Sequence, residues 1–489
     1  MNVDLNKKVE TLDPKNWDQL RALGHKMLDD MMFELENIRN SSHRFPSEED
    51  VSNILTELSE EGEGEEFVYE IFKKHILPTV LLNRPYFWAG VAGTGSPYGM
   101  LMEMLASGTN CGMEQVLSSY YTHKQSIDWI KQLLDYPEDA GGVLVSGGSE
   151  ANFTGLAVAR NAKAKQDMKT KGIQGLPEKM TLYGSEEMHH CLERSVELLG
   201  LGNEALRWLP TDDDYRIKIP SLVKAIEDDR ANGMHPFCII GNAGSVNTGS
   251  FDDFRSLREI ADKEDMWLHV DGAFGAWVKL SDTHRHLADG MEEADSLAVD
   301  LHKWMCMPYG IGCTLIRDKL AHYSTFVYGH EAEYIKSTKD FQQDVLSNPH
   351  NLALPLSRNF TSLKAYMLLR AYGKNKYKRL VQQNLDQINY LVELIEESQR
   401  LELMAPVVSN VVCFRYTCDG LSDEELETLN KEILGKLRRI RFGMILDTRI
   451  KGKHVLRLCN VNQKSRREDF EYLVNEMKRM GAELEKKYQ

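Results

Sequence analysis

Apolar, β-rich runs alternate with helix-like segments through the middle of this 489-residue chain, and this alternation constrains its fold more than any other feature. The runs are apolar on both faces, as in strands that are buried on both sides of a sheet. They lie at residues 141–148, 179–185, 235–244, 266–275, 295–300 and 310–318. The pattern predicts an α/β fold with a mostly parallel sheet that is covered by helices on both sides.

The two ends of the chain have different patterns. Residues 17–40 place apolar side chains at helical spacing, so this amphipathic segment must pack on the rest of the chain or on a second copy of it. The C-terminal part predicts a small α+β unit. In order, it has a helical stretch over 362–398, a strand over 406–417, a helix capped by Ser422 and Glu425, a strand over 453–461 and a final helix from about Arg466.

The charge balance argues against two classes of partner. With 59 Lys and Arg against 74 Asp and Glu, the net charge is −15, which disfavours nucleic acid and anionic membrane surfaces. No run approaches 18 consecutive apolar residues, and the first residues lack the basic and apolar regions of a signal peptide. We therefore expect a cytoplasmic protein, with its scattered cysteines reduced and mostly buried.

A glycine-rich turn follows the first apolar run. Gly147, Gly148 and Ser149 lead into a helical segment, and backbone N–H groups at such a helix start bind anions such as phosphate. The turn matches neither the dinucleotide-binding glycine motif nor the P-loop. By itself it is weak support for a phosphate site, because similar turns also serve packing alone.

Two charged residues end later runs. Asp271 closes the run MWLHV, and a carboxylate there needs a cation or strong donors to offset its burial. Lys303 follows the run DSLAVD, where apolar surroundings are expected to lower the pKa of its amine and make it a nucleophile. A single lysine is more often a solvated surface residue. Together, however, the turn, Asp271 and Lys303 meet the three needs of pyridoxal phosphate (PLP): an anion cradle, a partner for the ring nitrogen and an amine for the aldehyde.

The strings SGGSEAN, HVDGAFG and ADSLAVDLHKW resemble those of the PLP-dependent amino acid decarboxylases of the aromatic amino acid and glutamate decarboxylase group, and the resemblance extends over nearly the whole chain. It implies a homodimeric fold-type-I PLP enzyme with a seven-stranded, mostly parallel sheet. The implied domains are a partner-wrapping helical segment over 1–85, a PLP-binding domain over 86–360 and a small α+β domain over 361–489. No metal is expected, because the histidines lack a second ligand pair at zinc-site spacing.

The resemblance also implies roles for individual residues. His189 matches the histidine that stacks on the cofactor ring, with His190 as a nearby competitor, and Tyr334 in HEAEYIK matches the proton-donating tyrosine of a mobile loop. Lys303, His189, Tyr334 and Asp271 are therefore the expected catalytic residues. The expected cofactor contacts are Lys303, Asp271, His189, Ala273, Gly147, Gly148, Ser149, Ser245, Asp300 and His302, with Asp300 and His302 at positions that hold the phosphate.

The resemblance implies α-decarboxylation of an L-amino acid to an amine and CO₂, with an aromatic substrate as the first choice. Acidic amino acids and diaminobutyrate remain open, because Gly90–Ala92 replaces an aromatic run and Val246 replaces a threonine found in many members. An aldehyde synthase shares the scaffold, but such enzymes often have Phe in place of Tyr334. An aminotransferase, with Arg457 holding the α-carboxylate, and an inactive scaffold are the remaining alternatives.

Overall fold

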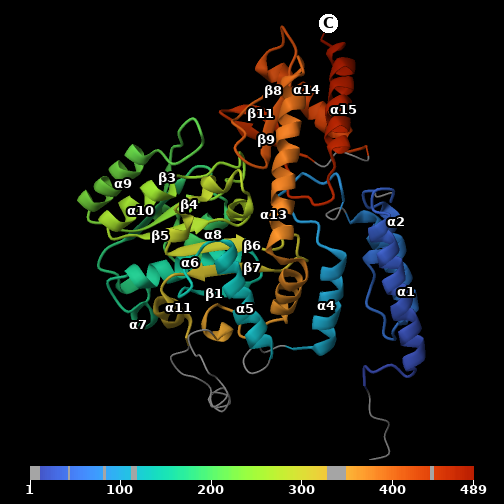
Figure 1. The fold of residues 1–489 in the computed structure, drawn as a ribbon, viewed down its shortest axis with the longest axis horizontal. Coiled ribbons are helices and arrows are strands. Elements are labelled where there is room, and N and C mark those ends of the chain that lie inside the picture. Colours follow the sequence, from blue (N-terminus) through green and yellow to red (C-terminus); the bar gives the residue numbers. More distant parts are fainter. Residues whose placement is uncertain are drawn as a thin grey trace, which may run out of the picture. The chain divides into compact units, whose positions relative to one another are not determined.

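The computed structural model describes residues 11–41, 44–80, 84–111, 118–327, 348–440 and 445–488 (Figure 1). Tyr334 lies outside the described residues. The chain divides into two compact units, Met1–Arg84 and Pro85–Gln489. The division into three domains that the resemblance implies stays a prediction.

The first unit is helical. Its helices are α1 (Trp17–Glu36), α2 (Glu48–Ile54) and α3 (Glu65–Ile71). Helix α1 begins after Asn16, whose side chain accepts hydrogen bonds from the first turn, and it ends four residues before the predicted end of the helix at residue 40. Asp50 anchors this unit as a buried carboxylate that pairs with Arg44 and His75. These contacts, together with the Ser47 hydrogen bonds, hold the pKa of Asp50 far below its usual value.

The second unit contains the predicted α/β sheet. Among the described residues, seven strands pair in the order β1-β7-β6-β5-β4-β2-β3. Their bounds are β1 (Gly141–Val145), β2 (Met180–Ser185), β3 (Leu206–Leu209), β4 (His235–Asn242), β5 (Trp267–Asp271), β6 (Ser296–Asp300) and β7 (Gly312–Ile316). Strands β2, β4, β5 and β6 are parallel to one another, as predicted, and β3 is parallel to β2.

Strand β7 is antiparallel to both of its neighbours, β6 and β1. Only residues 301–311 separate β6 from β7, which is too short for a parallel crossover of about a dozen or more residues. Strand β3 was not among the predicted runs, since it is a four-residue edge strand on which Trp208 is 41% exposed. The antiparallel direction of β7 therefore follows from the short connection before it, and the missing apolar pattern of β3 follows from its position at the edge of the sheet.

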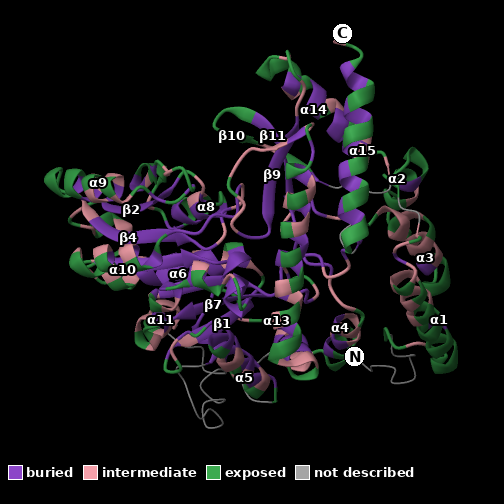
Figure 2. Cartoon of the chain, turned by 45° about the horizontal axis from the view of Figure 1, so that its top comes forward, coloured by how far each residue is buried: buried purple, intermediate pink, exposed green. Residues whose placement is uncertain are grey.

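Helices cover both faces of this sheet. Strand positions alternate between two apolar clusters: Ile239 packs with α5, α9 and α10, whereas Cys238 and Ile240 pack with α6 and α8. The helices of this region are α4 (Pro97–Thr109), α5 (Ser118–Leu133), α6 (Gly148–Lys163), α7 (Met168–Lys171), α8 (Cys191–Leu198), α9 (Ile219–Ala231), α10 (Phe254–Lys263) and α11 (Lys319–Phe326). Figure 2 shows that the strands between the helices are almost wholly buried.

The C-terminal part forms the predicted α+β arrangement. Helix α13 (Thr361–Glu396) bends at Gly373, where φ is 66°, and packs against both α5 and β8. Strands β8 (Leu401–Leu403), β9 (Val411–Tyr416), β10 (Leu446–Ile450) and β11 (Lys453–Cys459) form an antiparallel sheet, accompanied by α14 (Asp423–Leu437) and α15 (Arg467–Glu485). The predicted capping box of Ser422 and Glu425 is present at the start of α14. Among the described residues, no helix is long and apolar enough to cross a membrane.

Candidate active site

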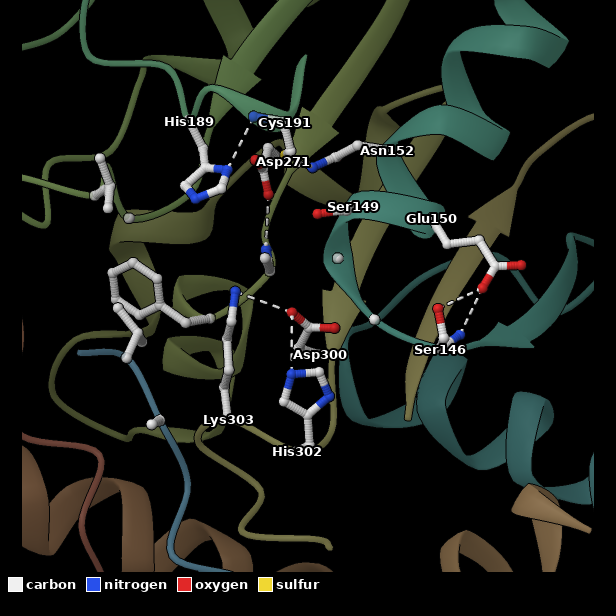
Figure 3. A pocket seen from close by; sticks show the side chains of 18 of the residues that line it. Ser146, Ser149, Glu150, Asn152, His189, Cys191, Asp271, Asp300, His302 and Lys303 are labelled. Carbon is white, nitrogen blue, oxygen red and sulfur yellow. Dashed lines mark hydrogen bonds and ion pairs between the residues drawn. The ribbon is translucent and has the colours of Figure 1, made fainter. Parts of the chain in front are cut away.

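A cavity of about 490 Å³ lies at the carboxyl ends of the strands of the seven-stranded sheet (Figure 3). This edge is where an open α/β sheet is expected to hold a ligand. Most of the residues predicted to contact the cofactor line the cavity: Gly147, Gly148, Ser149, His189, Asp271, Ala273, Asp300, His302 and Lys303. The tertiary structure therefore gathers residues that the sequence spreads over more than 150 positions.

The glycine turn opens onto this cavity at the N-terminus of α6. Gly147 is the residue before the helix, and as a glycine it has no side chain that could cap the first turn. A Cβ atom on Gly148 would lie 2.7 Å from Oδ2 of Asp300 and 3.1 Å from Cβ of Ala273, so only glycine fits here without displacing its neighbours. The backbone N–H groups of the first helical turn lie at the cavity, in the arrangement that binds anions.

Asp271 ends strand β5 at the floor of the cavity and is 7% exposed. Its Oδ1 accepts a hydrogen bond of 3.1 Å from the backbone N–H of Ala273, and its Oδ2 accepts one of 3.0 Å from Nδ2 of Asn152. These two donors offset part of the cost of burying the carboxylate. The carboxylate can still accept a further hydrogen bond, and a protonated ring nitrogen is a suitable donor.

Lys303 lies beside Asp300, and the prediction of a lowered lysine pKa was wrong. Burial by itself lowers the pKa of Lys303, but the charges of Asp300 and Asp271 outweigh that effect and raise it above its usual 10.5. The ammonium nitrogen is 2.9 Å from Oδ2 of Asp300. The sequence could not reveal this sign, because it depends on two carboxylates that the fold brings to the same amine.

His189 lines the cavity, whereas the side chain of His190 is 90% exposed and does not line it. Nδ1 of His189 accepts a hydrogen bond of 3.2 Å from the backbone N–H of Cys191. Burial lowers the pKa of His189, and Lys303 adds to this, while Asp271 opposes it. His189 is therefore a neutral ring that carries its proton on Nε2.

His302 is held by the segment that follows it. Its Nδ1 lies 2.8 Å from the carbonyl oxygen of Ile311, and its ring stacks on Tyr309 at a centroid distance of 4.6 Å. Burial lowers the pKa of His302. Its Nε2 is 3.8 Å from Oδ2 of Asp300, so the ring lies against the carboxylate that pairs with Lys303.

Two predicted site residues are not brought to the cavity by the described structure. Ser245 does not line it; its hydroxyl lies 2.9 Å from that of Thr248 and accepts a hydrogen bond from Ser250. Its role as a cofactor contact stays a prediction. The role of Tyr334 also stays a prediction, since it falls outside the described residues.

The cavity also contains residues to which sequence reasoning assigned no role: Asn152, Cys191, Asn242 and Tyr309. Asn152 follows Ser149 by three positions, and this closeness to the glycine turn was the signal that the sequence offered. Arg457, which an aminotransferase would use, is buried in β11 and donates from Nη1 to the carbonyl of Ala89, but it does not line the cavity.

Comparison with known proteins agrees with this geometry. The chain matches the model of the pyridoxal-dependent decarboxylase conserved domain over residues 48–417, and it belongs to this family. It is 29% identical over 484 residues to an aromatic-L-amino-acid decarboxylase of Bacillus atrophaeus, covering 96% of this chain and 97% of that protein. It is 28% identical to a phenylacetaldehyde synthase of Arabidopsis thaliana, with 92% of this chain and 94% of that protein covered.

The fold is shared with solved structures as well. The crystal structure of Oryza sativa TDC with PLP and tryptamine superposes with a TM-score of 0.88 at 20% identity, over 97% of this chain and all of that one. The chain is thus a PLP-dependent amino acid decarboxylase with a type I fold.

The residues present fit this cofactor. The uncapped start of α6 offers N–H donors for a phosphate, Asp271 offers an acceptor for a ring N–H, and Lys303 offers an amine for an aldehyde. Oδ1 of Asp300 is buried without a hydrogen-bond partner among the described residues, next to the glycine turn. Because a carboxylate oxygen can only accept, a group bound at this turn would satisfy Oδ1 of Asp300 only by offering an O–H or N–H donor, such as a protonated phosphate oxygen.

Proposed function

We propose that this enzyme removes the α-carboxyl group of an aromatic L-amino acid as CO₂ and releases the corresponding amine. The observation that carries the substrate class is the lining of the cavity. Val91, Ala92 and Phe274 lie at the cavity with Lys303, and among the described lining residues Lys303 is the only lysine or arginine. An acidic substrate side chain would find no further cation there, whereas an aromatic ring would find apolar contacts.

Each residue of the cavity has a task in this reaction. Bound PLP supplies an electron-withdrawing ring that accepts the electron pair left behind when CO₂ departs. Lys303 would hold the cofactor, and the N–H groups at Gly148 and Ser149 would bind its phosphate. Asp271 would accept the hydrogen bond of the ring nitrogen and keep that nitrogen protonated.

His189 and Tyr334 would act around the substrate. The neutral ring of His189 would lie against the cofactor and orient the departing carboxylate through Nε2–H. Tyr334 would deliver a proton to the substrate carbon after CO₂ has left. The latter assignment rests on its match to the family's loop tyrosine.

Each of the three alternative activities can be distinguished from an aromatic decarboxylase by one observation. An aldehyde synthase would consume oxygen, and one relative with 28% identity carries that name. A decarboxylase of acidic amino acids would need a cation that the described lining does not supply beyond Lys303. An aminotransferase would depend on added 2-oxoglutarate, and its expected anchor, Arg457, does not line the cavity.

We also infer a cytoplasmic homodimer. In support, α1 packs on α3 of its own unit through Lys26 and Glu70, yet it leaves Trp17 and Phe33 more than half exposed, as a surface for a second copy would be. Light scattering of the purified holoenzyme should give twice the mass of the 55.9 kDa chain. A monomer at micromolar concentration would contradict the inference.

A panel of the twenty standard L-amino acids, together with hydroxylated phenylalanine and tryptophan derivatives and 2,4-diaminobutyrate, tests the substrate class when CO₂ release is measured for each in the presence of PLP. We expect the highest kcat/KM with tyrosine, phenylalanine, tryptophan or a hydroxylated relative of them, and no release by Lys303→Ala. A preference for glutamate, aspartate or 2,4-diaminobutyrate would overturn the aromatic assignment. Oxygen uptake equal to CO₂ release would replace it with an aldehyde synthase.

A further inference from the structure

A chain of buried polar side chains runs away from the cavity behind Asp271. Nδ2 of Asn152 donates to Oδ2 of Asp271 at 3.0 Å, and Oδ1 of Asn152 lies 2.9 Å from Nε2 of His269. Nδ1 of His269 lies 2.7 Å from Oγ of Ser296, which accepts a hydrogen bond of 2.7 Å from Nε1 of Trp267. Figure 3 shows the first of these contacts, with Asn152 reaching from α6 toward Asp271.

The two ends of this chain decide the direction of every hydrogen bond in it. The indole of Trp267 can only donate, and the carboxylate of Asp271 can only accept. Asn152 must therefore turn its amide nitrogen toward Asp271 and its oxygen toward His269. His269 then carries its proton on Nε2 and leaves Nδ1 to accept from Ser296. All four hydrogen bonds point toward Asp271, so each one polarises the next in the same sense.

The surroundings leave little freedom for another arrangement. Asn152, His269 and Ser296 are completely buried, so an unmade hydrogen bond would not be replaced by water. A Cβ atom on Gly155 of α6 would lie 2.7 Å from Cε1 of His269 and 3.3 Å from Oγ of Ser296, so the helix has glycine where the imidazole passes. Burial lowers the pKa of His269 to about 4, and the ring is therefore neutral at physiological pH.

We propose that Asn152, His269, Ser296 and Trp267 are positioning residues that form a one-way hydrogen-bond relay, which fixes Asp271 and supports its negative charge toward the cofactor ring. The inference rests on the proposed role of Asp271 at the ring nitrogen. Other charged or titratable groups around Asp271 are Lys303, His189 and Cys191. None of these three groups is a member of the relay. The second hydrogen of the Asn152 amide is directed to Sγ of Cys191 at 3.3 Å, which further limits rotation of the amide.

Two substitutions of His269 separate a relay from simple packing. His269→Phe keeps the ring volume and removes both nitrogens, whereas His269→Gln keeps an N–H group that can reach Oδ1 of Asn152. Ser296→Ala breaks the relay two side chains away from Asp271. The readout is the ¹⁵N chemical shift of the ring nitrogen in holoenzyme loaded with ¹⁵N-labelled PLP, followed from pH 6 to pH 9, together with kcat and KM.

In the wild type we expect the ring nitrogen to stay protonated across this range. In His269→Phe it should titrate within the range, and kcat should fall about ten-fold with KM nearly unchanged, as expected when a buried hydrogen bond is lost and Oδ1 of Asn152 is left unpaired. His269→Gln should restore most of both values. Ser296→Ala should change them in the same direction but by less. Asp271→Asn should change the titration and kcat the most, because it removes the carboxylate itself.

Thr314→Val is the matched control. It removes one buried hydrogen bond of 3.1 Å to the carbonyl of Ala151 on the same helix but leaves the relay intact. Unchanged ¹⁵N shifts in His269→Phe, or equal losses in His269→Phe, His269→Gln and Thr314→Val, would overturn the relay. An unprotonated ring nitrogen in the wild type would instead contradict the proposed role of Asp271, so the two failures are distinguishable.

Discussion

The ammonium group of Lys303 lies 2.9 Å from a carboxylate oxygen of Asp300, and the two residues are only three positions apart at the end of β6. Because Asp300 is 1% exposed, its charge acts on Lys303 with little screening by water. With Asp271 it raises the pKa of Lys303, so the amine is held protonated until it loses its proton for reaction with an aldehyde.

Asp300→Asn should therefore lower the pKa of Lys303 and speed its reaction with an aldehyde at pH 7.5. Without the charge of Asp300, burial outweighs the remaining effect of Asp271 on the pKa of Lys303. Each unit by which this pKa falls raises the neutral fraction of the amine about ten-fold. Stopped-flow absorbance with pyridoxal, which lacks the phosphate, measures this rate without a change in phosphate binding. A pH–rate profile identical to that of the wild type would contradict the prediction.

The purified holoenzyme should be yellow, and borohydride should fix the cofactor on Lys303 because its amine is the only lysine or arginine group among the described residues that line the cavity. Lys303→Ala should abolish the fixed adduct. Peptide mapping by mass spectrometry identifies the modified residue. An adduct on a different lysine would remove the assignment of Lys303, and Lys364→Ala, at a buried lysine that pairs with Glu103, is a suitable control.

Tyr334→Phe should change the product rather than the release of CO₂. Without the phenol, the substrate carbon waits longer for its proton, and oxygen can react first to give aldehyde, ammonia and hydrogen peroxide. The wild type should give amine with little oxygen uptake. An oxygen electrode and an amine assay on both proteins test this. Amine as the main product of both, at similar rates, would assign the proton to another group.

The second unit should lose stability between pH 6.5 and pH 4. Burial lowers the pKa of His322 to about 4, whereas an unfolded histidine titrates near 6.5, so the unfolded state binds more protons in this range. At pH 5 the linkage for one such group costs about 2 kcal/mol of unfolding free energy.

His322→Gln tests this linkage. Nε2 of His322 lies 2.7 Å from the carbonyl oxygen of Leu352, and glutamine keeps an N–H donor there without a titrating ring. Urea unfolding at pH 7.5 and pH 5 should show a smaller acid loss in the variant than in the wild type. Equal losses would mean that other groups, such as His269, account for the acid sensitivity.

Local signals were sufficient for the elements that are defined by their own residues. The parallel strands β2, β4, β5 and β6 follow from apolar runs, and the start of α14 follows from the Ser422–Glu425 pair. By contrast, the edge strand β3 carries little apolar pattern, and the reversal at β7 is a property of the connection. Such features depend on which neighbour the chain can reach, not on the residues of the strand.

Residue type and short-range spacing are enough to predict the class of fold, the glycine turn, and the positions of Asp271 and Lys303 at strand ends. The contacts and the electrostatic surroundings of these residues depend on how the chain folds. Asn152 meets Asp271 across 119 positions and His269 across 117, and these contacts exist only because parallel strands and α6 converge at one edge of the sheet. The raised pKa of Lys303 was likewise settled by the fold, since burial and two carboxylates act on the amine with opposite signs and only their distances decide which effect is larger.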